Sequence, residues 1–124
     1  MTKRLLDDCV RLAKILVHKH TQHFQHYTFV VRDNKIIEWG TNKSAEPLIF
    51  LGYSPHQKIH SEFMAWRAAK GLLHGKEFEM VNVRLGKKSE IKISKPCEVC
   101  YAWLLTLNCS HIWYTTSSGI FEKM

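Results

Sequence analysis

Apolar side chains near the start of the chain recur every three or four residues, which is the spacing of one helical face. They are Leu5, Leu6, Cys9, Leu12, Ala13 and Leu16. The charged residues among them are Lys3, Asp7, Arg11 and Lys14. The pattern predicts an amphipathic helix with its charged face toward solvent.

The next regular pattern is that of two strands. Residues 27–32 and 35–39 are rich in β-branched and aromatic side chains and flank the dipeptide Asp33-Asn34. Such runs on either side of two turn residues predict a hairpin with a tight turn. Residues 41–59 follow no period, so we expect a long irregular connection, a kind of loop that often carries function.

Helical and strand patterns alternate from residue 61 to the end of the chain. Helical patterns cover residues 61–75, with Gly75 as the stop, and residues 96–109. Pro96 fits the first helical position, where a missing N–H costs nothing. Strand patterns cover residues 80–86, 111–116 and 120–124. This order predicts an α/β domain in which helices cover a mixed sheet of about five strands.

The connections predict the strand directions. The helix at 96–109 joins the strands at 80–86 and 111–116, which predicts a right-handed parallel crossover. Only a short turn separates the strand at 111–116 from residues 120–124. A parallel connection needs about a dozen residues or more, so the last two strands should form an antiparallel hairpin.

The composition is that of one globular domain spanning residues 1–124. The formal net charge of +7 points toward an anionic partner, such as a nucleotide, a nucleic acid or an acidic surface. Asp7, Asp8, Arg11 and Lys14 stand where a secretory signal would be apolar, and no apolar run is long enough to span a bilayer. We therefore expect a cytoplasmic protein without a membrane partner, whose thiols stay reduced.

Two of the four cysteines have metal-ligand spacing. Cys97 and Cys100 lie three residues apart at a predicted helix start, where a thiolate is favoured over a thiol. Taken alone, the pair could equally be a redox motif or two core thiols. His60, also at a predicted helix start, supplies a third ligand type for zinc. Glu62 lies two residues farther on, where its carboxylate could act as a general acid and base beside the metal.

The segments "HSE", residues 60–62, and "PCEVC", residues 96–100, resemble the motif of the cytidine deaminase-like zinc deaminases. The resemblance covers most of the chain and implies a three-layer α/β/α fold. It also implies that His60, Cys97 and Cys100 hold Zn²⁺, that zinc-bound hydroxide is the nucleophile and that Glu62 is the proton shuttle. A structural zinc with Glu62 as its fourth ligand is the alternative.

The resemblance implies further contacts with a substrate. The backbone N–H of Ser61 would contact the base, and Asn42, in "GTN", would contact the sugar. Ser61 stands where the family usually has alanine, and Ser44 stands where its free-nucleoside deaminases have a sugar-binding glutamate. The expected antiparallel last pair of strands is nevertheless similar to that of the free-nucleoside branch.

The resulting hypothesis is hydrolytic deamination of cytosine to uracil in a free (deoxy)cytidine nucleoside or nucleotide. The alternatives are deamination of single-stranded DNA or RNA, chemistry on another base, and a zinc-stabilised binding module without activity. Proteins of this family resemble one another in forming oligomers, so we expect a homo-oligomer, for which the apolar residues 47–53 are candidates.

Other clusters have simpler interpretations. We interpret His18, His20, His23 and His26 as part of a solvated loop and not as a second metal site, because their spacing fits no single face. Cys9 and Cys109 should be packed core thiols. The basic residues Lys87, Lys88, Lys92 and Lys95 are interpreted as solvated, the alternative being a phosphate contact close to the metal.

Overall fold

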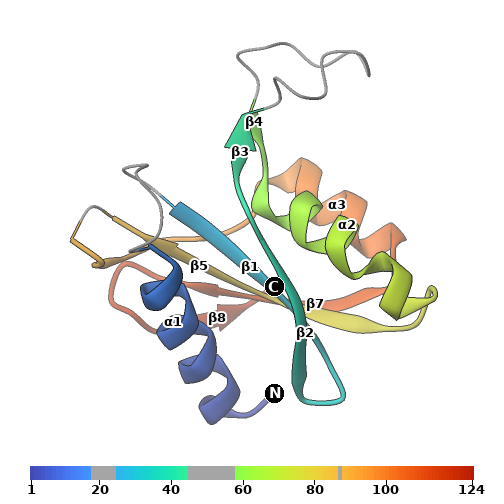
Figure 1. Ribbon diagram of the computed structural model, residues 1–124, viewed down its shortest axis with the longest axis horizontal. Coiled ribbons are helices and arrows are strands. Elements are labelled where there is room, and N and C mark those ends of the chain that lie inside the picture. Colours follow the sequence, from blue (N-terminus) through green and yellow to red (C-terminus); the bar gives the residue numbers. More distant parts are fainter. Residues whose placement is uncertain (18–24, 45–57, 87) are drawn as a thin grey trace.

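The computed structural model describes residues 1–17, 25–44, 58–86 and 88–124 (Figure 1). The helices are α1 (Lys3–Val17), α2 (Ser61–Leu73) and α3 (Glu98–Thr106). The strands are β1 (Gln25–Arg32), β2 (Lys35–Thr41), β3 (Lys43–Ser44), β4 (Lys58–Ile59), β5 (Phe78–Leu85), β6 (Ile91–Lys92), β7 (Cys109–Thr115) and β8 (Phe121–Lys123). The predicted α/β class is thereby confirmed.

The main sheet is mixed and has six strands, one more than expected. Its order is β2-β1-β5-β7-β8, with the short β6 paired to β5. β5 and β7 run parallel and are connected through α3, as the crossover argument predicts. β7 and β8 are antiparallel, which confirms the predicted terminal hairpin. The strand directions therefore follow from the lengths of the connections.

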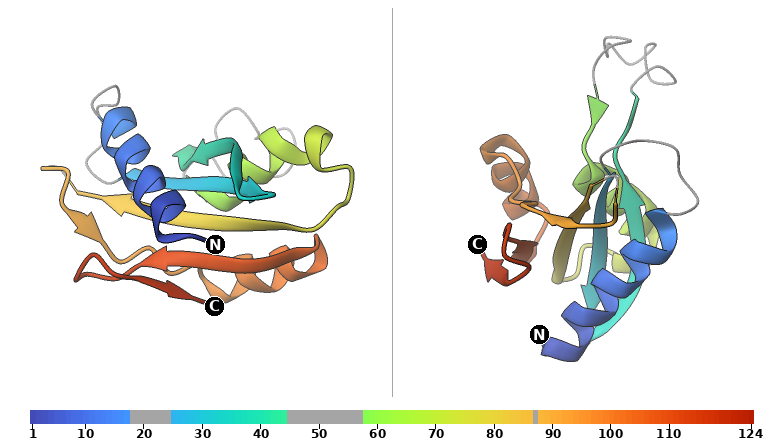
Figure 2. Two further views of the ribbon diagram at one scale, coloured as in Figure 1. Left: turned by 90° about the horizontal axis from the view of Figure 1, so that it is seen from below. Right: turned by 90° about the vertical axis from the view of Figure 1, so that its left-hand side faces the viewer.

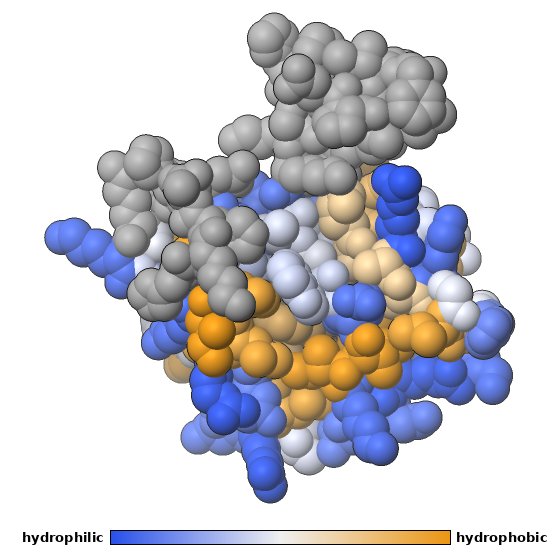
Figure 3. Space-filling view, viewed as in Figure 1, coloured by the Kyte–Doolittle hydropathy of each residue, from blue (hydrophilic) through white to orange (hydrophobic). Residues whose placement is uncertain are grey.

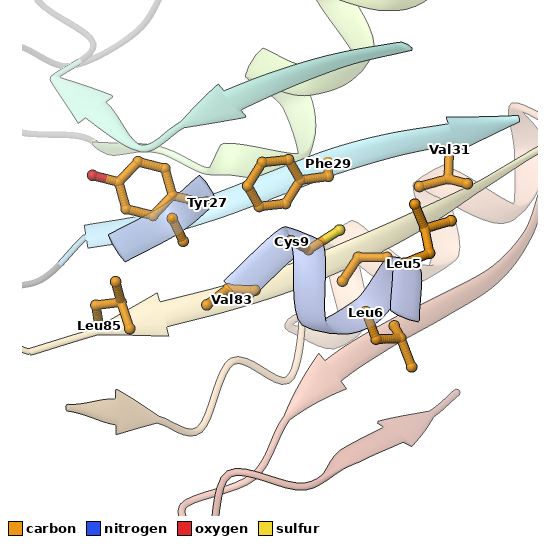
Figure 4. Packing of buried hydrophobic residues seen from close by; sticks show 10 residues of the cluster. Leu5, Leu6, Cys9, Tyr27, Phe29, Val31, Val83 and Leu85 are labelled. Atoms are coloured by element: carbon orange, nitrogen blue, oxygen red, sulfur yellow. The ribbon is translucent and has the colours of Figure 1, made fainter. Parts of the chain in front are cut away.

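α1 covers one face of the sheet with the side chains predicted from its apolar pattern. Leu5, Leu6, Cys9 and Ala13 are buried against alternate residues of β1 and β5 (Figure 4). Partly buried apolar residues of α1 and β2 pack against the same core. Figure 3 shows apolar side chains forming a band over the region where these two elements lie.

α2 and α3 cover the opposite face, which completes the three layers (Figure 2). α2 contributes buried Ala65, Ala69 and Leu73 and packs over β1 and β2. α3 packs against β7, and Leu104 is the one buried residue among its nine. An edge-to-face pair of Trp66 and Trp103, with ring centroids 5.4 Å apart, joins the two helices. α2 therefore buries more side chains against the sheet than α3 does.

Gly40 brings α2 directly onto β2. A Cβ atom at this position would lie 2.6 Å from the carbonyl carbon of Met64 and 2.8 Å from Cα of Ala65. Both distances are far below van der Waals contact, so only glycine permits this approach. Because α2 begins at the metal-ligand candidate His60, the contact at Gly40 helps to set where that ligand stands.

The backbone angles of two turns are those expected from the residues that form them. Asp33 and Asn34 adopt φ angles of 52° and 61°, as the predicted tight hairpin turn requires. α2 ends at Leu73 with His74 as its C-cap in the left-handed region, so the helix stops two residues before Gly75, which itself adopts a φ of 74°.

Some sequence-based boundaries were wrong. Pro96 is not the first residue of α3, because Cys97 is the N-cap and the helix begins at Glu98. The connection at 41–59 is not wholly irregular, since β3 and β4 pair antiparallel within it. His26 belongs to β1 and not to a loop.

Several expectations concern residues outside the described part of the chain. They include the proposed solvated loop at His18, His20 and His23 and the apolar segment 47–53. None of the helices in the described ranges is both long enough and apolar enough to cross a membrane.

Candidate metal centre

Side chains from two distant segments of the sequence, His60 and the pair Cys97 and Cys100, meet where α2 and α3 begin. Nδ1 of His60 lies 3.0 Å from Sγ of Cys100 and 3.8 Å from Sγ of Cys97. Their ligand atoms all lie within 4.8 Å of one another. The motif spacing therefore corresponds to a cluster of side chains that could hold a metal ion.

The two helix starts explain this meeting. His60 is the N-cap of α2 and makes no side-chain capping bond, so its imidazole is directed to the cysteines. Cys97 is the N-cap of α3, and its sulfur accepts a hydrogen bond from the backbone N–H of Cys100 at 3.4 Å. Helix N-termini favour negative charge, so the position of both cysteines at the start of α3 is one contribution that favours their thiolates.

The donor set fits zinc. Tetrahedral zinc with bonds of about 2.3 Å to sulfur and 2.0 Å to nitrogen would separate those two ligands by roughly 3.5 Å. The two observed nitrogen–sulfur distances, 3.0 and 3.8 Å, lie on either side of that value. Among the described residues the cluster offers three potential protein ligands. Three ligands with a position left open are typical of catalytic zinc sites, whereas structural sites close with a fourth.

Without a metal, the environment of Cys100 disfavours its thiolate. Burial is the largest cause, followed by the hydrogen bond with Cys97 and the charges of Glu62 and Cys97, and together they raise the pKa of Cys100 from 9.0 to about 12. A dication at this position would reverse the balance, because it stabilises the thiolate directly.

Glu62 is buried beside the cluster, with an exposed fraction of 5%. Its Oε1 accepts a hydrogen bond of 2.8 Å from the side-chain amide of Asn82 on β5. The same amide group also donates to the carbonyl oxygen of Ser94 at 3.3 Å. Glu62 is therefore oriented by the sheet, and it is not part of the ligand cluster itself.

The hydrogen bonds around Asn82 have a defined direction. The hydroxyl of Thr28 donates to Oδ1 of Asn82 at 2.7 Å. Because that hydroxyl has a single proton, its contact of 2.8 Å with the hydroxyl of Ser61 must be a bond that Ser61 donates. Donation thus runs from Ser61 through Thr28 and Asn82 to Glu62. All four residues are buried, so each of these groups needs its partner.

A cavity of about 360 Å³ opens beside the cluster. Its lining comprises His26, Asn42, His60, Ser61, Glu62, Arg84, Lys95, Pro96 and Cys97. The volume is at the lower end of the range of about 300–1,000 Å³ for small-molecule pockets. All the residues assigned to substrate contact or catalysis from sequence therefore line one cavity with two of the three ligand candidates.

Asn42 and Ser61 occupy different parts of the lining. Oδ1 of Asn42 accepts a hydrogen bond from the backbone N–H of His26 at 3.0 Å. This bond fixes the orientation of the amide and leaves its NH₂ group as the donor for a ligand. Ser61 is the first residue of α2, where backbone N–H groups have no acceptor within the helix. Both positions therefore offer donors to the cavity.

Sequence reasoning missed four residues of this region. Thr28 and Asn82 lie within strands that were interpreted mostly as core, and His26 and Arg84 lie two positions from them along those strands. The position of Asn82 between Val81 and Val83, both apolar, is the signal that could have identified it. Lys95 is exposed, as expected for a solvated stretch, but it also lines the cavity.

The chain matches no protein-family model and no curated protein.

Proposed function

We propose that the protein is a zinc-dependent deaminase of the cytidine deaminase-like kind, which converts cytosine to uracil in a free (deoxy)cytidine nucleoside or nucleotide. One observation carries the proposal: the buried carboxylate of Glu62 lines the same cavity as His60 and Cys97. A carboxylate held beside a three-ligand zinc cluster, without belonging to it, is the arrangement needed for metal-assisted hydrolysis.

Each residue of the site has its own part in the proposed reaction. Zinc held by His60, Cys97 and Cys100 would supply a Lewis acid that lowers the pKa of a bound water toward neutrality. Glu62 takes a proton from the attacking water and gives it to N3 of the cytosine ring. The water oxygen forms a bond to C4, and Glu62 then moves the second proton from that oxygen to the amino group. The bond between C4 and the amino nitrogen breaks, and ammonia leaves. Water and the aminopyrimidine are thereby converted to the oxopyrimidine and ammonia.

Two further residues orient the substrate. The free N–H of Ser61, at the first position of α2, donates to the base. The amide NH₂ of Asn42 donates to a sugar hydroxyl, since its oxygen is already bonded to the backbone of His26. The hydrogen bond from Asn82 holds Glu62 in place between these contacts. As in similar deaminases, we expect a homo-oligomer.

A second candidate substrate is single-stranded nucleic acid, which is favoured by the net charge of +7. It would use the same residues for the same chemistry. The distinction lies in whether one nucleotide or a strand is recognised.

The proposal is tested by ammonia release from the zinc-loaded protein. The panel comprises cytidine, deoxycytidine, their monophosphates and a cytosine-containing single strand, with Glu62→Gln as the control. We expect turnover of a small substrate that Glu62→Gln abolishes while one zinc per chain stays bound. Zinc binding without turnover of any of these compounds would contradict the proposal and favour a binding module or another base.

A further inference from the structure

Three basic residues form a row across the sheet, and two of them, His26 and Arg84, line the cavity. His26 on β1 is the Cα partner of Arg84 on β5, and Arg84 is in turn the partner of Lys92 on β6. Partnered residues of adjacent strands project from the same face. Lys92 is paired with Glu90, at 3.8 Å between Nζ and Oε1, so Arg84 is the cationic side chain of this row that lines the cavity.

The pair His26 and Arg84 lies two residues along β1 and β5 from Thr28 and Asn82, which orient Glu62. Along β1 and β5 the successive partners on this face are Val30 with Met80, Thr28 with Asn82, and His26 with Arg84. The first pair is buried under α2 and α3, and the second is bonded to Ser61 and Glu62. Two residues of strand span about 7 Å, so the basic pair lies about that far along the strands from the pair that is bonded to Ser61 and Glu62.

Lys95 adds a positive charge from another part of the lining. It lies two residues before Cys97, on the segment that leads into α3. Among the described residues of the lining, Glu62 is the acidic one, and its Oε1 is bonded to Asn82. Two thiolates balance the charge of a zinc ion. Arg84 and Lys95 are the cationic side chains among the described residues of the lining.

We propose that this cavity binds a phosphorylated substrate, with Arg84 and Lys95 contacting the phosphate and His26 completing the subsite. The inference rests on the proposed function, since it names the substrate class of that same site. A cavity of about 360 Å³ fits one nucleotide unit. The phosphate is then that of a free mononucleotide or of one unit in a strand, because both carry the same chemical group.

The test is a binding experiment that does not depend on turnover. Uridine and uridine 5′-monophosphate, which carry the product base, are titrated calorimetrically into the zinc-loaded protein. We expect the monophosphate to bind at least about tenfold more tightly, because hydrogen bonds between opposite charges are strong. Arg84→Gln and Lys95→Gln should each remove most of this preference and leave uridine binding within about twofold.

Lys35→Gln is the matched control, because it removes the same charge at the far end of the β1–β2 hairpin. It should leave both affinities unchanged. Equal affinity for uridine and its monophosphate in the parent, or a preference that survives in both cavity variants, would overturn the phosphate subsite. Unchanged uridine binding in the variants demonstrates that they are folded.

The outcomes separate this proposal from the proposed function. Deamination of cytidine with equal binding of both uridine compounds would keep the deaminase and reject the phosphate subsite. A preference for the monophosphate that depends on Arg84 and Lys95, without deamination of any cytosine compound, would keep the subsite and reject the deaminase. The same dependence for a short uridine-containing strand alone would assign the phosphate to a polynucleotide.

Discussion

Asn82, at the centre of β5, donates its side-chain amide to the carboxylate of Glu62 in the first turn of α2, at 2.8 Å. The bond crosses from the sheet to a helix and joins two buried groups. It makes the position of the proposed proton shuttle depend on a residue that lies outside the ligand cluster.

Asn82→Ala should therefore lower kcat without loss of metal. We expect kcat for the best cytosine substrate to fall by about 10–100-fold, as is common when a supporting hydrogen bond is lost, while KM changes by less than about threefold. Steady-state kinetics and zinc stoichiometry check this. Asn108→Ala is the control, because Asn108 is exposed and bonds to Gly75. An unchanged kcat in a folded Asn82→Ala protein would mean that Glu62 needs no such support.

Removal of a thiolate should abolish stable metal binding. Cys97→Ala leaves His60 and Cys100, and two ligands are too few for a tetrahedral zinc site. We expect the parent to bind one zinc per chain after dialysis and Cys97→Ala to bind far less, as measured by elemental mass spectrometry. Cys9→Ala, on the opposite face of the sheet, should keep the full zinc content. Full zinc content in Cys97→Ala would show that the ligands are other residues.

Two Gly→Ala substitutions should change stability in opposite directions. Gly40→Ala forces a methyl group into the backbone of α2 and should cost about 1–3 kcal/mol in the free energy of unfolding. Gly71→Ala, inside α2, meets nothing within 4 Å and should add up to about 1 kcal/mol through helix propensity. Urea denaturation of both variants measures the difference. Equal effects would contradict the close approach of α2 to β2.

Stability should decrease at alkaline pH because of two core thiols. Burial is the main cause that raises the pKa of both Cys9 and Cys109 from 9.0 to about 12. Above pH 9.0 the unfolded chain therefore releases these protons while the folded chain retains them. Unfolding is then favoured as pH rises toward about 12, by up to about 1.4 kcal/mol per pH unit for each thiol.

Urea denaturation from neutral pH to about pH 10.5, with a reductant present, measures this effect. The double variant Cys9→Ala, Cys109→Ala should lose less stability over the same range. The comparison with the parent cancels the contribution of the metal ligands, which both proteins share. Identical pH dependence in the two proteins would mean that these thiols are not protonated preferentially in the folded state.

The sequence predicted those features that depend on local patterns. The period of α1 identified its buried face, and the short turn before β8 identified the antiparallel hairpin. The paired motif identified His60, Cys97 and Cys100 because each part of it lies at the start of a helix. Cys9 and Cys109 were correctly expected in the core.

The remaining features depend on pairings between distant segments. That Thr28 and Asn82 lie under Glu62 follows from the register of β1 with β5, which no local pattern in either strand reveals. The start of α3 was misplaced because Cys97 caps the helix through sulfur, which a rule based on Pro96 does not anticipate. The role of His26 at the cavity was missed because it was grouped with its neighbours in sequence and not with Arg84.

α3 is secured to the rest of the protein by few groups, since Leu104 is its one buried residue. A metal ion would be held on one side by well-anchored α2 and on the other by a helix that can detach locally. In amide hydrogen exchange, α3 of the metal-free protein should exchange well before α2, and metal should slow it. Release of a bound metal would then depend on how often α3 opens, so a substitution that weakens the packing of α3 should shorten the time for which the ion is retained.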